Sequence, residues 1–127
     1  MNRRNVTIIT LLILIAAGIW LGKKNNFSKP YSNEDLFRDT NHLILTKHVK
    51  CRMDCRHITE PEIKEVIHNG NVNYSKSGEG NKGDETYALE GYSSEHQHIR
   101  VVVAPENDGL VVITCIDLEK EWPCNCY

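Results

Sequence analysis

An uncharged apolar run, Val6–Gly22, constrains this chain most, because it takes 17 of the 127 residues out of any water-soluble fold. The run lies between two pairs of basic residues and contains no charged side chain that would give a helix a polar face. As a helix it extends about 26 Å at ~1.5 Å per residue, close to the thickness of a thin hydrocarbon core. The sequence therefore predicts a transmembrane helix at the N-terminus, within residues 1–22.

The same run can be a cleaved signal peptide, because Ala16, Ala17 and Gly18 are small residues of the kind found at signal-peptidase sites. The apolar run continues past them, which favours a retained signal anchor. A short basic head before such a run indicates that the following domain lies outside the cytoplasm, so we expect a single-pass membrane protein. Residues 23–40 are polar and predict a tether, which leaves residues 41–127 for the domain.

Two helices are expected at the start of this domain. Thr46 can cap a helix over residues 47–57. Thr59 and Glu62 form a capping box for a second helix over residues 60–68. A domain of only about 87 residues has a marginal core, so a staple such as a disulfide or a metal would stabilise it.

The rest of the domain is rich in β-branched residues and turn signals. Four strands are expected, over residues 72–74, 86–90, 98–104 and 110–116. Because the connections are tight, we expect antiparallel pairing. The predicted fold class is α+β, with an N-terminal transmembrane helix and then two helices packed on a four-stranded antiparallel sheet. The glycine-rich loop 78–83 lacks the strand-to-helix context of a phosphate loop, so no dinucleotide cofactor is expected.

The first predicted helix of the domain carries the residues that most suggest a functional site. His48, Arg52 and Arg56 repeat every four residues and therefore share one stripe of that helix. Arginine offers a rigid fork for phosphate or carboxylate, and histidine can transfer a proton near neutral pH. With Arg100 from a neighbouring strand, they form the candidate catalytic or anion-binding set.

Charge weighs against an extended nucleic-acid interface. Without the two N-terminal arginines, 13 basic residues face 17 acidic ones. Proteins that bind nucleic acid through many phosphates are usually basic, so a nucleic-acid site here must be a local patch. The acidic residues also offer a structural alternative, in which the two helix arginines pair with carboxylates at the helix junction and only support the fold. The carboxylates in reach are those of Glu60, Glu62 and Glu65.

The cysteines form two close pairs, Cys51 with Cys55 on the helix and Cys124 with Cys126 in the tail. Neither pair suits an internal bridge, but the helix pair and the tail pair can meet and pin the C-terminus against the helix. Outside the cytoplasm this arrangement gives disulfides, and inside it gives a four-thiolate zinc site. Zinc is the one cofactor considered, and free thiols are the third alternative. Cys115 lies in an apolar strand and is expected to be a small buried side chain.

A motif runs through the first predicted helix of the domain, with Thr46, His48, Arg52, Met53, Arg56 and Ile58 at its specific positions. Together with the capping box and the Arg-Val-Val-Val strand, it resembles a bacterial family of domains of unknown function. That family is similar to the RelE-type toxins, within the wider barnase–EndoU–colicin–RelE ribonuclease fold. The likeness covers about residues 43–118. It implies a ribonuclease-toxin-like fold and brings no assigned activity with it.

Two functions follow from these features. The first is a membrane-anchored module with a ribonuclease-toxin-like fold that binds an anion or a protein partner. The alternative is a metal-independent ribonuclease acting on RNA, in which His48 transfers the proton and the arginines stabilise the phosphorane. His96 and His98 precede Arg100 and can supply a second proton-transfer group. The acidic balance favours the binding module, and the His/Arg stripe favours the ribonuclease.

Overall fold

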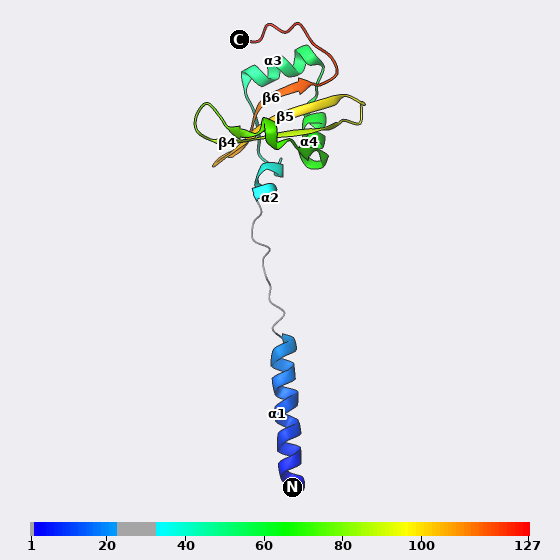
Figure 1. The fold of residues 1–127 in the computed structure, drawn as a ribbon, viewed down its shortest axis with the longest axis vertical. Helices are drawn as coiled ribbons and strands as arrows, with labels where there is room; N and C mark the ends of the chain where they lie inside the picture. Colours follow the sequence, from blue (N-terminus) through cyan, green and yellow to red (C-terminus); the bar gives the residue numbers. More distant parts are fainter. Residues whose placement is uncertain (1, 23–32) are drawn as a thin grey trace. The chain divides into compact units, whose positions relative to one another are not determined.

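The chain divides into two compact units, Met1–Pro30 and Tyr31–Tyr127. The computed structural model describes residues 2–22 and 33–127. The first unit holds α1 (Arg3–Gly22), and the second holds the elements labelled from α2 onward in Figure 1. Its helices are α2 (Asn33–Arg38), α3 (Lys47–Arg56), α4 (Glu60–Asn69) and the 3₁₀ helix η1 (Tyr74–Lys76). Its strands are β1 (Leu43–Leu45), β2 (Asn71–Val72), β3 (Gly78–Glu79), β4 (Glu85–Tyr92), β5 (His98–Glu106) and β6 (Gly109–Asp117).

Two predictions about the N-terminal helix α1 are contradicted by the structure. Within residues 2–22 and 33–127, no helix is both long enough and apolar enough to cross a membrane. The predicted transmembrane helix and the predicted single-pass membrane localisation are therefore wrong. The uncharged run in α1 has 17 residues, fewer than the about 20 apolar residues that a span of the hydrocarbon core normally requires.

The sheet of the second unit is mixed, not antiparallel. Its strands follow the order β1-β6-β5-β4-β2, and β3 pairs with β4 beside this path. β1 runs parallel to β6, with Leu43 opposite Leu110 and Leu45 opposite Val112, while the other pairs are antiparallel. The predicted four-stranded antiparallel sheet is therefore wrong, although the α+β class holds. A three-residue apolar segment such as β1 becomes a strand only through a partner distant in sequence.

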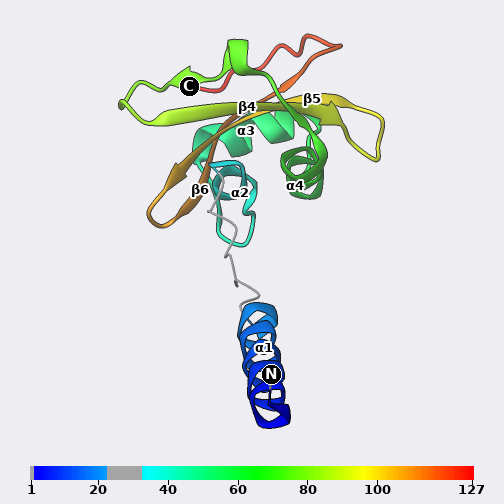
Figure 2. The same cartoon turned by 60° about the horizontal axis from the view of Figure 1, so that its bottom comes forward.

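The two predicted helices at the start of the domain are confirmed as α3 and α4, each within one residue of its expected end. The Thr46 side chain accepts a hydrogen bond from the Val49 amide and caps α3. α3 ends at His57, whose left-handed backbone (φ 54°) turns the chain toward α4. Both helices lie on the same side of the sheet in Figure 2.

The packed domain begins earlier than residue 41, because α2 belongs to it. Phe37 is 3% exposed and stacks on Tyr87, with ring centroids 4.2 Å apart. Arg38 donates from Nη1 to the carbonyls of Ile67 (2.8 Å) and Gly70 (3.1 Å) at the end of α4. Of the predicted tether over residues 23–40, residues 23–32 lie outside the described residues.

One core joins the helices to the sheet. Val49 and Met53 from α3 and three residues of α4 pack against buried side chains of β4, β5 and β6. The α4 residues are Ile63, Val66 and Ile67, and the fully buried strand residues of this core are Leu89, Ile99, Val101, Val103, Leu110, Val112 and Cys115. Burying these apolar side chains is the main favourable contribution to folding.

A β-bulge in β6 decides which of its side chains face the core. Val102 pairs with Thr114 and Val103 pairs with Val112, so Ile113 is an extra residue without a partner on β5. Strict alternation would place Val112 and a residue three positions later on opposite faces. The bulge lets both Val112 and Cys115 face the core, and it leaves two consecutive residues, Ile113 and Thr114, turned away from the core.

The carboxylate of Glu62 ties the start of α4 to the loop after β4. It is 4% exposed and accepts hydrogen bonds from the Thr59 amide (2.8 Å), the Thr59 hydroxyl (2.9 Å) and the Ser93 hydroxyl (2.7 Å). Burial by itself raises the pKa of Glu62, but these hydrogen bonds outweigh burial and lower the pKa below its usual value. The predicted capping box is therefore confirmed, with Ser93 as an additional partner.

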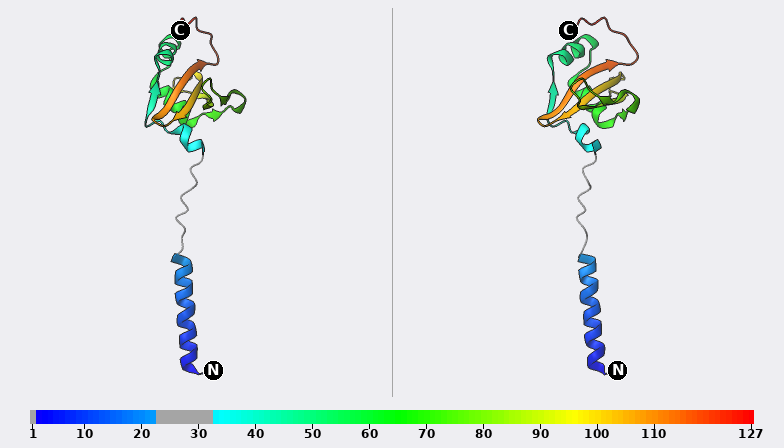
Figure 3. Two further views of the ribbon diagram at one scale, coloured as in Figure 1. Left: turned by 90° about the vertical axis from the view of Figure 1, so that its left-hand side faces the viewer. Right: turned by 60° about the vertical axis from the view of Figure 1, so that its left-hand side comes forward.

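Two disulfides fix the C-terminal tail against α3. Cys51 is bonded to Cys126 and Cys55 to Cys124, each with Cα atoms 5.8 Å apart, while Cys115 is free and buried. The predicted meeting of the helix pair with the tail pair is confirmed, as disulfides. Figure 3 shows the tail, in red, passing beside α3.

The two disulfides should stabilise the domain in a non-additive way. Either one alone closes a loop with a sequence separation of 75 or 69 residues, which is worth roughly 4 kcal/mol in chain entropy. Once one disulfide has formed, the second closes only a short additional ring and therefore contributes less to stability. In urea unfolding of the full chain, the double variant Cys51→Ser with Cys126→Ser should therefore lose about 2 kcal/mol of unfolding free energy. The variant with all four disulfide cysteines replaced by serine should lose about 6 kcal/mol. If the fourfold variant loses only twice the unfolding free energy that the double variant loses, the two disulfides act additively and the expected non-additivity is contradicted.

The Glu62 hydrogen bonds should make stability depend on pH. A carboxyl whose pKa is lowered in the folded state stabilises it above the unfolded-state pKa, and this contribution is lost as the pH falls through the folded-state pKa. Glu62→Gln should cost about 1–3 kcal/mol of unfolding free energy at pH 7 and less at pH 3. Glu60→Gln, at an exposed position of the same turn, is the control. An equal loss for Glu62→Gln at both pH values would refute the assignment.

Candidate functional site

The stripe predicted on the first helix of the domain is present on α3, and its first two members are joined. Arg52 donates from Nε to Nε2 of His48 at 2.7 Å. Because arginine Nε is always a donor, the lone pair of His48 Nε2 is occupied and the imidazole carries its proton on Nδ1. In the described part of the chain no acceptor is bonded to that Nδ1–H. We call His48, Arg52 and Arg56 the cationic stripe.

Arg56 connects α3 to the edge of the sheet. Its Nη1 donates to the backbone carbonyl of Cys115 on β6. β1 ends opposite Val112, so this carbonyl lies beyond the ladder between β1 and β6 and receives its donor from a side chain instead. Burial lowers the pKa of Arg56, and the charge of Arg52 lowers it further.

Within the described residues, the two arginines of the cationic stripe make no ion pair with a carboxylate. Among residues 2–22 and 33–127 the ion pairs are Arg38–Glu34, Lys64–Glu60 and Arg100–Glu90. The acidic residues of the structural alternative are engaged elsewhere, since Glu62 binds Thr59 and Ser93 and Glu65 accepts from the Ser94 amide. Asp117 is near enough to favour the charged form of Arg56, yet it makes no ion pair with it. The stripe is therefore a half-buried positive patch on an acidic domain.

Arg100, the fourth predicted site residue, is separate from this patch. Its Nε donates to Glu90 Oε1 at 2.6 Å, and the same oxygen accepts from Asn73 Nδ2 at 2.9 Å. Burial by itself raises the pKa of Glu90, but the hydrogen bonds from Arg100 and Asn73 outweigh it and lower the pKa. Within the described residues, no hydrogen bond links Arg100 to the cationic stripe. Arg100 thus supports the pairing of β4 and β5.

The predicted second proton-transfer groups, His96 and His98, make contacts of their own. His98 stacks on Tyr92 with ring centroids 4.3 Å apart. His96 is exposed, has a left-handed backbone (φ 63°), and borders a hollow of about 480 Å³ that His57 and Trp122 also line. Neither histidine is hydrogen-bonded to His48 in the described structure.

A groove that the sequence did not indicate lies beside His48. Val102, Ala104, Val111 and Ile113 line it from β5 and β6, and His48 lines it from α3. Its volume is about 410 Å³. The apolar run from Leu110 to Ile116 gave no sign of this groove, because every residue but one in it is apolar and the bulge leaves no pattern.

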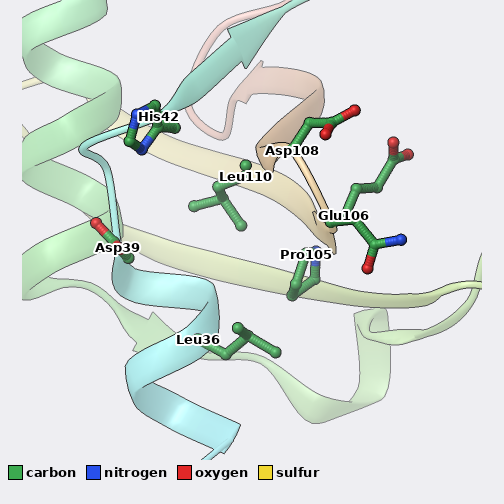
Figure 4. Close-up of a pocket in the computed structure, with 9 residues that line it drawn as sticks. Leu36, Asp39, His42, Pro105, Glu106, Asp108 and Leu110 are labelled. Carbon is green, nitrogen blue, oxygen red and sulfur yellow. The ribbon is translucent and has the colours of Figure 1, made fainter.

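Another hollow, at the turn between β5 and β6, does not suit an anion. Figure 4 shows it between α2 and the Pro105–Gly109 turn, with Leu36 and Leu110 among the labelled side chains. Asp39, Glu106 and Asp108 line it and make it acidic. No residue of the cationic stripe contributes to it.

The four cysteines proposed as metal ligands are bonded in pairs. Cys51, Cys55, Cys124 and Cys126 therefore present no thiolate in this state, and a zinc site would need the reduced protein. Among the residues described by the structure, no group of three or more His, Cys, Asp or Glu side chains is placed to hold a metal ion.

These features define a small α+β domain, stapled by disulfides, whose helix α3 carries a cationic stripe at the sheet edge. The model of a protein family described as "Domain of unknown function (DUF4258)" matches residues 45–117. The match covers more than half of the chain, so the chain belongs to this family, and the expected membership of a family of domains of unknown function is confirmed. The matched segment includes the cationic stripe and Arg100. No curated protein and no solved structure matches the chain.

Proposed function

We propose that the domain is an anion-binding module and that Arg52 and Arg56 bind the anion. The observation that carries this proposal is the pair of half-buried guanidinium groups on α3, which form no ion pair with any carboxylate of the described residues. Two like charges close together in a partly desolvated site raise the free energy of the folded state. A bound phosphate or carboxylate would relieve this repulsion through charge-assisted hydrogen bonds.

The donors left over on the stripe support the same function. Within the described part of the chain, Arg52 donates only from Nε and Arg56 only from Nη1, so each has further N–H groups for a ligand. The bond from Arg56 to the Cys115 carbonyl fixes one guanidinium, and His48 orients the other. Such preorganisation lowers the entropic cost of binding.

Ribonuclease activity is the weaker alternative. A general base needs a free lone pair in reach of its proton, but Nε2 of His48 is occupied by Arg52. Arg100, which the ribonuclease alternative required as a further cation, is bound to Glu90. A ribonuclease-toxin-like ancestry, close to the RelE-type toxins, is supported by the motif on α3 and the α+β fold. We propose that this chain keeps the binding site without the cleavage step.

The disulfides support a location where thiols are oxidised. Disulfides persist in secreted and extracytoplasmic proteins and are rare in reducing compartments. The proposed partner is therefore an anion met in an oxidising compartment. An anionic group on a protein partner fits the acidic body of the domain better than RNA, whose many phosphates would be repelled outside the stripe.

Calorimetric titration of the full chain with inorganic phosphate tests the binding site. Arg52→Gln should weaken phosphate binding at least about fivefold, because it removes one of two charge-assisted partners. Lys50→Gln removes the same charge from an exposed position of α3 and should change the affinity less than about twofold. Equal losses for both variants would mean diffuse surface charge, and an unchanged affinity for Arg52→Gln would contradict the proposal.

The same proteins separate binding from cleavage when they are incubated with RNA. We expect the wild-type chain to leave RNA intact under conditions where phosphate binding is measured. Cleavage that disappears in His48→Ala, with an unchanged circular dichroism spectrum, would instead establish the ribonuclease.

A further inference from the structure

The hydrogen bond between Arg52 and His48 can exist in only one protonation state of the imidazole. Arginine Nε always carries a hydrogen, so Arg52 Nε, 2.7 Å from His48 Nε2, needs the lone pair of that nitrogen as its acceptor. A proton on Nε2 would set two N–H donors and two positive charges against each other. Protonation of His48 at Nε2 therefore breaks this hydrogen bond and frees the Nε–H of Arg52.

Protonation would also change the charge of the cationic stripe. Burial lowers the pKa of Arg56, and the charge of Arg52 lowers it further, so the two guanidiniums already interact. A protonated His48 would add a third positive charge and a new N–H donor beside Arg52. An anion bound at Arg52 would gain from both.

The charged groups that face His48 from other elements do not take the place of an anion. Lys82 and Asp84, from the loop between β3 and β4, and Glu106 from β5 line the groove that His48 also lines. In the described part of the chain, neither carboxylate forms an ion pair with His48. The bound anion would therefore be the negative charge in direct contact with a protonated His48.

Two effects of protonation on anion binding oppose each other. The loss of the hydrogen bond leaves Arg52 less well oriented, which costs about as much as immobilising one side chain again. The added charge attracts the anion, and between unit charges about 4 Å apart at an effective dielectric constant of about 20 this attraction is larger than that cost. Protonation should therefore favour the bound state.

We infer that the cationic stripe binds its anion together with a proton, which His48 takes up. This inference rests on the proposed anion site and adds its regulation by pH. Histidine side chains change charge between about pH 8 and pH 5. Because the bound state holds more protons than the free state, the affinity for the anion rises as the pH falls through this range.

Calorimetric titration of the full chain with sulfate tests the inference. Sulfate keeps its charge across this pH range, whereas inorganic phosphate itself gains a proton. Sulfate should bind at least about tenfold more tightly at about pH 5.5 than at about pH 8. Titrations at one intermediate pH, in two buffers with different ionisation enthalpies, should show a net uptake of protons on binding.

A matched pair of substitutions identifies the group that takes up the proton. His48→Gln offers Arg52 an amide oxygen as acceptor but cannot be protonated, so it should abolish the proton uptake and reduce the pH effect to less than about threefold. His42→Gln is the control, because His42 is exposed and lines the hollow between α2 and the β5–β6 turn. It should keep both the proton uptake and the pH effect of the wild-type chain.

The outcomes separate this inference from the proposed function, with Arg52→Gln reporting on the anion site itself. If Arg52→Gln weakens sulfate binding but the wild-type chain takes up no proton, the inference is overturned and the anion site stands. The same holds if His48→Gln keeps the pH effect, or if His42→Gln loses it to the same extent. If sulfate binds at neither pH, the proposed function fails and this inference fails with it.

Discussion

The placement of α3 against the edge of β6 is the constraint on which the candidate site depends. On one side Arg56 donates to the Cys115 carbonyl, and on the other two disulfides join Cys51 and Cys55 to the tail. The side chains of Val49 and Met53 are buried in the core and hold the inner face of the helix against the sheet. With its position and rotation set in this way, α3 holds its arginines beside the sheet instead of free in solvent. In a domain this small, the covalent staple supplies stability that the core alone provides poorly.

The helices of the domain were predictable because their signals are local. Thr46 and the Thr59–Glu62 capping box specify where α3 and α4 begin, and each makes the hydrogen bonds that its sequence pattern predicts. The spacing of His48, Arg52 and Arg56 placed them on one stripe correctly. The cysteine pairs were predictable in part, because geometry disfavours a bridge within each pair, so that any disulfides would have to join the helix pair to the tail pair. Disulfide rather than zinc chemistry did not follow from spacing.

The features that sequence analysis missed depend on partners distant in the chain. β1 exists because Leu43–Leu45 aligns with Leu110–Val112, and no local pattern specifies a parallel pairing. The acceptor for Arg56 is a backbone carbonyl, which any residue could supply. Arg100 was predicted to belong to the site, but it binds Glu90, its cross-strand neighbour. The register of β4 and β5 that brings the two together cannot be read from the sequence. The apolar groove depends on the bulge at Ile113, which a uniformly apolar run conceals.

The most direct test of the account follows the arginine side chains themselves. In the full chain, the Nε–Hε NMR signals of Arg52 and Arg56 can be followed during a titration with inorganic phosphate. Both signals should shift in a saturable way, because these guanidiniums bind the anion. The signals of Arg38 and Arg100 should stay in place, because each is already paired with a glutamate. Shifts of equal size at Arg38 or Arg100, or no shift at Arg52 and Arg56, would contradict the proposed anion binding.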